Sequence, residues 1–283
     1  MELSIIERTY SSWSLRAWLA VELVGAPCEV RSAGKGTQAF AQMRRDNFPA
    51  LTVPVLRFDD GAMVWESLSI MEELAHRHPE AGLWPEAPAA RAAARALAGE
   101  MHAGFAALRR DCPMNLERRY AGFEPSIEVL EDVARIETLW TWAAERFGGE
   151  GPWLFGARPC AADLMFAPVI ARFVTYQLGE TEITVRLQDA LYAWGPFRRW
   201  RAMGVAETRR LEEYELDLPE ARRFAVEPGR KAANPSCPCS GSPVAPDALG
   251  EIEGRVIGFC NRFCRDRSLA DADAWPKLAP LLA

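Results

Sequence analysis

The chain has 283 residues, of which 49% are hydrophobic and 25% charged, and its net charge is -6. This composition is typical of a soluble globular protein with about two domains. The acidic balance argues against a nucleic-acid-binding protein. No apolar run of about 18 residues predicts a membrane span. The first residues lack a basic region followed by an apolar stretch, so we expect no signal peptide and a cytoplasmic location.

The first 80 residues are expected to alternate strands and helices. Leu15, Trp18 and Leu19 recur with helical spacing and predict a helix from Ser12 to about Val24. A second helix is expected to open at Ser67 and to stop before Pro79. Between the two helices, residues 31–54 show a less regular pattern. Apolar runs predict the strands, the last two of which flank a hairpin turn at 59–61: residues 3–6, 28–30, 55–58 and 63–65.

From residue 89 onward the pattern predicts helices only. A proline-containing linker is expected at 78–88, so we predict a first domain at 1–80 and a helical domain at 89–215. A second linker at 227–235 precedes a small module at 228–283. The longer helices of the second domain are expected at 89–110, from 127 to the glycines at 148–149, and at 161–173.

Three serines occupy the predicted start of the first helix. A hydroxyl in the first turn can cap backbone N–H groups, which is the ordinary role of such a residue. It can also donate to an anion held at the positive end of the helix dipole, such as a thiolate. The candidates for this second role are Ser11, Ser12 and Ser14.

Two further short motifs follow at the ends of predicted elements. Pro54 either interrupts the start of a strand or, with a cis bond, turns the Val53 backbone toward a peptide-like ligand. Ser67 is a good N-cap, and it could equally hold a ligand carboxylate at the helix N-terminus. Glu66 beside it could hold an ammonium group or could be a solvated surface residue.

The three motifs together resemble the glutathione transferase superfamily over about residues 1–215. The run Tyr10-Ser11-Ser12-Trp13-Ser14-Leu15-Arg16 is similar to the start of serine-type, zeta-like bacterial members. The resemblance implies a thioredoxin-like domain followed by a helical domain, and it implies a homodimer. It implies that Ser11, with Ser12 and Ser14 as close alternatives, activates the glutathione thiol. Val53 and Pro54 match the loop that binds the glutathione backbone, and Glu66 with Ser67 matches the γ-glutamyl contact pair.

The chain also departs from the family pattern. Trp13 stands where zeta-type members usually carry a cysteine, which argues against maleylacetoacetate isomerase activity. Cys160 stands at the cap position of a helical-domain motif that keeps its Asp163, and a cysteine is a weaker capping group. The helical domain would supply the second-substrate pocket, although an aromatic stripe is more often ordinary core. The candidate lining residues are Trp140, Trp142, Phe166, Phe173 and Tyr176.

Four cysteines crowd the C-terminal module as Cys237-Pro-Cys239-Ser-Gly and Cys260-Asn-Arg-Phe-Cys264. In a reducing compartment such a cluster favours a metal, with Zn²⁺ the first choice, over a redox disulfide or free thiols. The pattern resembles the TRASH and YHS-type treble-clef metal modules. The Cys-x-Cys spacing is tight, so Cys237 or Cys239 is a candidate spare thiol.

The predicted function is a glutathione-dependent transferase that acts on a small electrophile. One alternative is a non-catalytic, transferase-like binding protein whose tail senses or delivers a metal. Another is a glutathione-dependent isomerase, and a thiol reductase is disfavoured because no cysteine stands at the first helix start. The identity of the electrophile does not follow from the fold.

Overall fold

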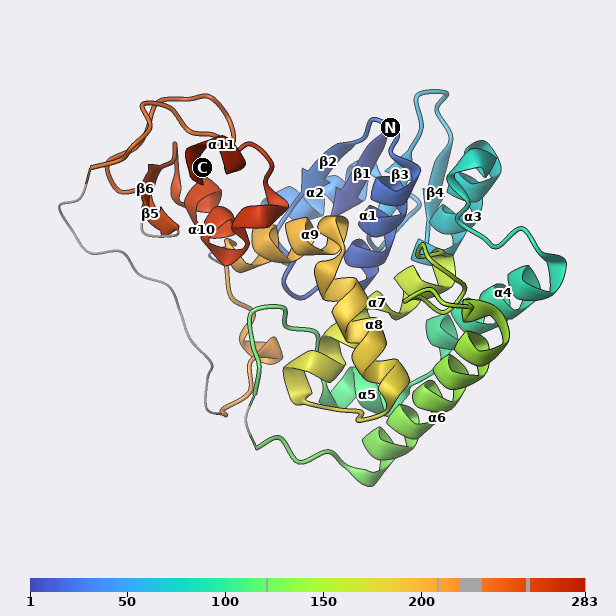
Figure 1. Ribbon diagram of the computed structural model, residues 1–283. Coiled ribbons are helices and arrows are strands. Elements are labelled where there is room, and N and C mark those ends of the chain that lie inside the picture. The colour runs from blue at the N-terminus through green and yellow to red at the C-terminus, as the bar shows by residue number, and fades with distance from the viewer. Residues whose placement is uncertain (121, 208, 219–230, 253–254, 283) are drawn as a thin grey trace.

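The computed structural model describes residues 1–120, 122–207, 209–218, 231–252 and 255–282. The chain forms a thioredoxin-like region, a helical region and a C-terminal cysteine module, in that order (Figure 1). This arrangement confirms the predicted fold class. Within the described residues, no helix combines the length and the apolar character needed to cross a membrane.

A four-stranded sheet forms the centre of the N-terminal region, with the order β2-β1-β3-β4. Strand β1 pairs in parallel with β2 and antiparallel with β3, and β3 pairs antiparallel with β4. The parallel pair requires a crossover connection, which α1 provides. The strands are β1 (Glu2–Ile5), β2 (Glu29–Ser32), β3 (Val55–Arg57) and β4 (Met63–Trp65).

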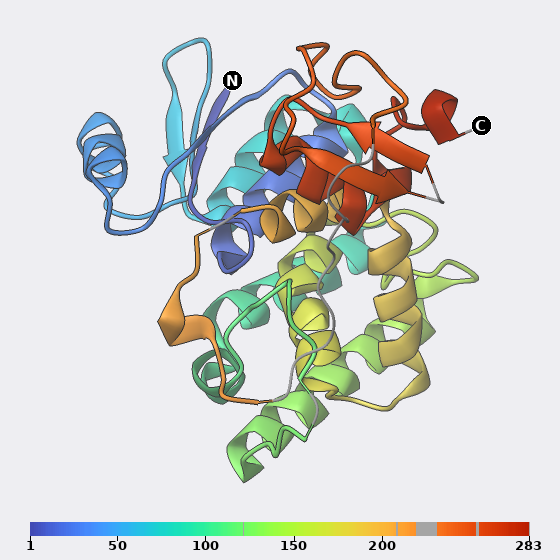
Figure 2. The same cartoon turned by 90° about the vertical axis from the view of Figure 1, so that its left-hand side faces the viewer.

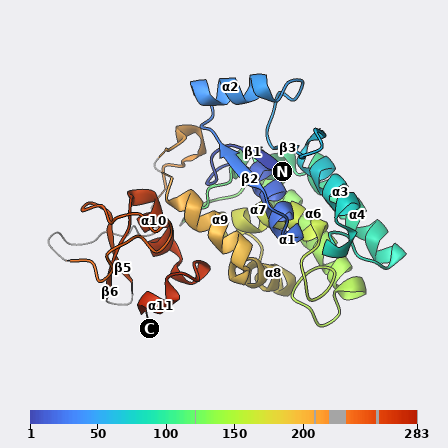
Figure 3. The same ribbon diagram turned by 90° about the horizontal axis from the view of Figure 1, so that it is seen from above.

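Helices cover both faces of this sheet. Helix α1 (Ser12–Val24) and helix α3 (Ser67–Arg77) pack together on one face, and Figure 3 shows helix α2 (Gln38–Asp46) on the other side. The expectation of a less regular segment before β3 was wrong where α2 lies. Thr37 caps this helix, but Met43 is its only buried residue, so few apolar side chains mark it in the sequence.

The helical region surrounds α7, which is buried along almost its whole length. The expected helix at 89–110 is broken after Ala103, because Phe105 adopts a left-handed conformation with φ 61°. The elements are η1 (Pro79–Ala81), α4 (Pro88–Ala103), α5 (Ala106–Asp111), α6 (Ile127–Ala143), the π-helical turn η2 (Ala144–Gly148), α7 (Ala161–Tyr176), α8 (Glu182–Ala193), α9 (Gly195–Val205) and η3 (Glu212–Tyr214).

The cysteine module is a two-stranded hairpin packed against helices, with a small apolar core of its own. Its elements are β5 (Leu249–Ile252), β6 (Arg255–Gly258), α10 (Arg262–Ala270), η4 (Ala272–Ala274) and α11 (Ala279–Leu282). Helix α10 packs on α9 of the helical region, as Figures 1 and 2 show from two sides. Residues 227–230 of the predicted second linker lie outside the described residues.

Candidate functional site

Ser11 is the N-cap of α1. Its side chain accepts a hydrogen bond from the Ser14 N–H at 3.3 Å and donates to the Ser14 hydroxyl at 2.8 Å. Ser14 is fully buried, and its hydroxyl also accepts from the Ile6 N–H at 3.2 Å. Ser14 therefore fixes the β1–α1 loop, whereas Ser11 remains partly exposed at the helix N-terminus.

Ser12 connects the two large regions of the molecule. Its hydroxyl accepts from the Arg172 guanidinium at 3.0 Å and lies 3.7 Å from the Met114 sulfur. Arg172 belongs to α7, and Met114 follows α5. The start of α1 is thus held against the helical region at the position where the predicted thiol would bind.

A cavity of about 270 Å³ lies in front of these serines. Its wall combines the β1–α1 loop, the Val53 loop, two arginines of the helical region and the segment that follows α9. The lining residues are Ile6, Glu7, Tyr10, Ser11, Ser12, Trp13, Lys35, Val53, Arg109, Pro113, Arg172, Leu211 and Tyr214. The structure therefore brings Ser11, Ser12 and Val53 together in one cavity.

Arg16 and Arg109 pack against Trp13, and together with Arg172 they make the site cationic. The guanidinium carbons of Arg16 and Arg109 lie 4.5 and 4.9 Å from the centroid of the Trp13 ring. Burial, together with the neighbouring positive charges, lowers the pKa of Arg16 and lowers that of Arg172 to about 10. None of the three arginines forms an ion pair with a carboxylate in the described part of the chain. An anion in the cavity would offset this buried positive charge.

The second predicted half of the site lies at the start of α3. Val53–Pro54 is a cis peptide, and Glu66 precedes the helix with a φ of 74°. Ser67 is fully buried, and its hydroxyl has no hydrogen-bond partner among the described residues. A free buried hydroxyl at a helix N-terminus fits a ligand carboxylate.

His102 connects the two halves. Its Nε2 lies 3.9 Å from a carboxylate oxygen of Glu66, and its ring lies 5.3 Å from the ring of Trp13. Arg16 and Arg109 also lie in contact with Trp13. Only the fold reveals these positions, because the residues come from α1, α4 and α5.

The aromatic candidates do not line this cavity. Four of them lie in the core with at most 2% of their surface exposed: Trp140, Phe166, Phe173 and Tyr176. Trp142 is exposed on α6, where its ring contacts Phe147. Cys160 is buried, and burial raises the pKa of its thiol well above the usual value, so it does not provide a reactive thiolate.

Three of the four tail cysteines come together in the C-terminal module. The sulfur atoms of Cys237, Cys260 and Cys264 all lie within 4.8 Å of one another. Burial opposes ionisation of Cys237, but hydrogen bonds from the Ser240 hydroxyl and from backbone amides outweigh it and lower the pKa to about 6. The Cys239 sulfur lies apart from this cluster, 3.7 Å from the Ser268 hydroxyl.

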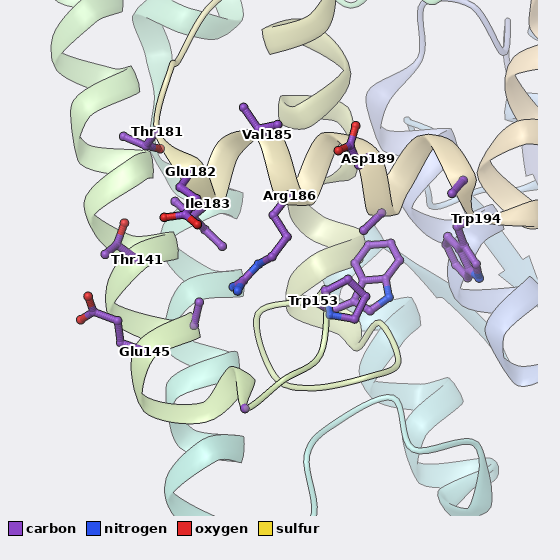
Figure 4. A pocket seen from close by; sticks show the side chains of 15 residues that line it. Thr141, Glu145, Trp153, Thr181, Glu182, Ile183, Val185, Arg186, Asp189 and Trp194 are labelled. Atoms are coloured by element: carbon purple, nitrogen blue, oxygen red, sulfur yellow. The ribbon is translucent and has the colours of Figure 1, made fainter.

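A larger groove of about 1350 Å³ runs between α6 and α8 (Figure 4). Arg186, Trp153 and Trp194 lie along it, with the carboxylates of Glu145 and Asp189 at its rim. None of the predicted glutathione or metal residues lines the groove in the described part of the chain. Of the predicted residues, Ser11, Ser12 and Val53 line the smaller cavity instead.

Comparison with known proteins agrees with this geometry. Residues 5–82 match the family described as glutathione S-transferase, N-terminal domain. A maleylacetoacetate isomerase of Pseudomonas aeruginosa is 27% identical over 225 residues, which cover 78% of this chain and 98% of the isomerase.

Two solved structures share the fold. A maleyl pyruvate isomerase, described as a bacterial zeta-class glutathione S-transferase, has a TM-score of 0.52 at 20% identity and covers 71% of this chain and 96% of that chain. Glutathione transferase Omega 3C of Trametes versicolor has a TM-score of 0.54 at 18% identity and covers 71% and 87%, respectively. The match at residues 5–82 makes the N-terminal region similar to that family's N-terminal domain, and the two structures share the fold of a thioredoxin-like region followed by a helical region.

Proposed function

We propose that this protein is a glutathione-dependent enzyme that adds the glutathione thiolate to a small electrophile. The addition either completes a conjugation or begins an isomerisation. The observation that carries the proposal is the cationic cavity at the N-terminus of α1, which Ser11, Val53 and Arg172 line together. The similarity to a maleylacetoacetate isomerase over most of the chain supports a glutathione-dependent reaction.

The site can supply the energy needed to hold a thiolate. Lowering a thiol pKa from about 9 to about 7 corresponds to roughly 3 kcal/mol. A hydrogen bond from the Ser11 hydroxyl to the charged sulfur contributes about 1.5–3 kcal/mol, and the helix N-terminus adds about 0.3–1 kcal/mol. The thiolate then forms a C–S bond while a π bond of the electrophile opens, or while its leaving group departs with the bonding electron pair. When the product is an isomer, the C–S bond breaks again and the π bond re-forms.

The rest of glutathione would lie between Val53 and the start of α3. The backbone N–H and C=O of Val53 would pair with the cysteinyl unit. The free Ser67 hydroxyl and the first N–H groups of α3 would bind the γ-glutamyl carboxylate. Glu66 would pair with the γ-glutamyl ammonium group.

The buried arginines favour an acidic second substrate. Arg109 and Arg172 line the same cavity as Ser11 and Ser12, and the acceptors of their described hydrogen bonds are backbone carbonyls and the Ser12 hydroxyl. A carboxylate on the electrophile would therefore gain charge-assisted hydrogen bonds that are worth more than neutral ones. We expect a succinyl adduct of glutathione to bind more tightly than glutathione itself, and Arg172→Met to remove that difference.

Calorimetric titration with glutathione tests the proposal directly. The protein should be of known metal content and should be compared with the double variant Glu66→Ala/Ser67→Ala. Binding in the micromolar to millimolar range that the double variant abolishes is the expected result. The absence of binding by the unchanged protein would overturn the proposal and favour the non-catalytic, metal-binding alternative.

A specific observation also supports a metal in the C-terminal module. Sulfur atoms that bind one Zn²⁺ ion tetrahedrally at about 2.3 Å lie about 3.8 Å apart, and the Cys260 and Cys264 sulfurs lie at 3.8 Å. We therefore infer a structural zinc site made of Cys237, Cys260 and Cys264. The treble-clef resemblance supports this assignment, and Cys239 is the spare thiol.

We also infer a homodimer from large apolar side chains on the surface. Phe48 and Leu51, in the loop between α2 and β3, are 74% and 61% exposed. Exposed apolar side chains of this size are typical of a contact surface. Sedimentation should give twice the chain mass, and a monomer would contradict the inference.

A further inference from the structure

The outer wall of the candidate cavity comes from a segment that belongs to neither large domain core. Residues 209–216, which we call the 209–216 segment, follow α9 and lead toward the cysteine module. Leu211 and Tyr214 from this segment line the same cavity as Ser11 and Ser12. The ring of Tyr214 lies 5.2 Å from the ring of Tyr10, so the two tyrosines form one aromatic wall.

The 209–216 segment is tied to the thioredoxin-like region at one end. Arg209 forms hydrogen bonds with the Glu7 carboxylate and with the Lys35 carbonyl. The Lys35 ammonium lies 3.3 Å from the Glu213 carboxylate and 5.8 Å from the centroid of the Tyr214 ring. Glu7 is only 4% exposed, so its pair with Arg209 is shielded from solvent.

The same segment is tied to the helical region at its other end. The Glu215 carboxylate accepts from Arg118 of the helical region at 2.8 Å, and it also accepts from the Tyr10 hydroxyl of the β1–α1 loop at 3.0 Å. The Leu216 N–H donates to the Tyr120 hydroxyl at 3.1 Å. These bonds flank Tyr214 and hold both tyrosines in place before a ligand binds, which reduces the entropic cost of binding.

We propose that Tyr214 is a specificity-determining residue whose ring, with that of Tyr10, packs against the group attached to the glutathione sulfur. The inference deepens the proposed function and rests on it. The substituent it favours is apolar or planar, because two aromatic rings provide the wall. Arg109 and Arg172 line the same cavity and accommodate any acidic group that the substituent carries.

The inference can be tested by comparing the Kd values of two ligands, neither of which has to react. Glutathione and S-hexylglutathione share the peptide, but only the second places an apolar chain in the cavity. We expect the unchanged protein to bind S-hexylglutathione about tenfold more tightly. Tyr214→Ala should lower this ratio about fivefold and leave the Kd of glutathione unchanged. Tyr214→Phe, which keeps the ring, should retain the ratio.

Glu212→Ala is a matched control in the same segment, because Glu212 is exposed and does not line the cavity. It should change neither Kd. An unchanged ratio in Tyr214→Ala would overturn the inference, as would equal weakening of both ligands, which indicates a purely structural role. Failure of the unchanged protein to bind glutathione would instead overturn the proposed function itself, and the inference with it.

Discussion

Ser11 is the N-cap of α1, and its hydroxyl can donate a hydrogen bond either to Ser14 or to a bound ligand. It now donates to Ser14 at 2.8 Å, and a bound thiolate would be the stronger acceptor. We expect Ser11→Ala to raise the pKa of bound glutathione by about 1–2 units and to slow thiol addition at neutral pH about 10-fold to 100-fold. The thiolate absorbance of the bound peptide, followed against pH, measures the shift.

Two neighbouring substitutions make this assignment specific. Ser11→Thr keeps the hydroxyl and should retain most of the activity. Ser12→Ala removes the acceptor for Arg172 but not the cap, so it should leave the pKa of the bound thiol nearly unchanged. A large pKa shift in Ser12→Ala with none in Ser11→Ala would transfer the role to Ser12.

Some of the residues that line the cavity could be identified from the sequence alone, and others could not. Ser11 and Val53 lie in short motifs next to predicted element boundaries, so local pattern was enough to propose them. Arg172 lies within an apolar helix, and no local pattern tells which distant group it contacts. Tyr214 was missed because its placement depends on a segment folding back across two domains after the last long helix. It follows two arginines and is flanked by glutamates, and this charged run is a signal that could have indicated ion pairing.

At the level of elements, the start of α7 depends on one buried carboxylate. Asp163 is 1% exposed and accepts from the Cys160 N–H at 2.9 Å and the Leu154 N–H at 3.0 Å. The sequence predicted a weakened helix start from Cys160, but the reciprocal capping box is present: the Cys160 side chain accepts from the Asp163 N–H, and the Asp163 carboxylate accepts from the Cys160 N–H. Leaving two buried N–H groups unpaired costs about 1–3 kcal/mol each.

We therefore expect Asp163→Ala to lower the free energy of unfolding by about 2–5 kcal/mol. Asp163→Asn keeps one carbonyl acceptor and should lose about half as much. Urea unfolding, fitted with the same m-value for every variant, measures the free energy of unfolding of both variants. Equal stability of Asp163→Ala and the unchanged protein would show that other groups cap α7.

The sequence misplaced two features of the fold. Helix α2 is short and buries only Met43, so few apolar positions indicate it. The break between α4 and α5 combines Gly104, the C-cap of α4, with the left-handed conformation of Phe105. The glycine is a local signal for a helix end, whereas the conformation of Phe105 depends on the surrounding structure.

At the scale of the whole molecule, α9 connects the cysteine module to the loop that carries the thiol site. On one side, Arg198 of α9 forms hydrogen bonds with Asp271, which caps η4 of the module. On the other side, the Trp200 indole N–H donates to the Arg8 carbonyl at 2.9 Å, three residues before Ser11. The cysteine module therefore packs against the rest of the structure. Its distinct amino-acid composition did not predict this contact.

We expect three of the four tail cysteines to hold the metal. Cys237→Ser, Cys260→Ser and Cys264→Ser should each bind zinc at least 10-fold more weakly, because each replaces a thiolate ligand by a neutral hydroxyl. Cys239→Ser is the matched control, since its sulfur contacts Ser268 instead of the cluster, and it should keep one zinc per chain. Metal content after dialysis against a chelator measures the loss.

The module should also lose structure together with its metal. Its core is small, and two of the three clustered sulfurs belong to buried residues of that core, Cys237 and Cys264. Removing the ion would therefore weaken the contact between α10 and α9. Hydrogen exchange should rise first in residues 255–270 and should change little in α7, whose packing does not involve the module. Stoichiometric zinc in Cys237→Ser, or equal loss in Cys239→Ser, would contradict the three-thiolate site.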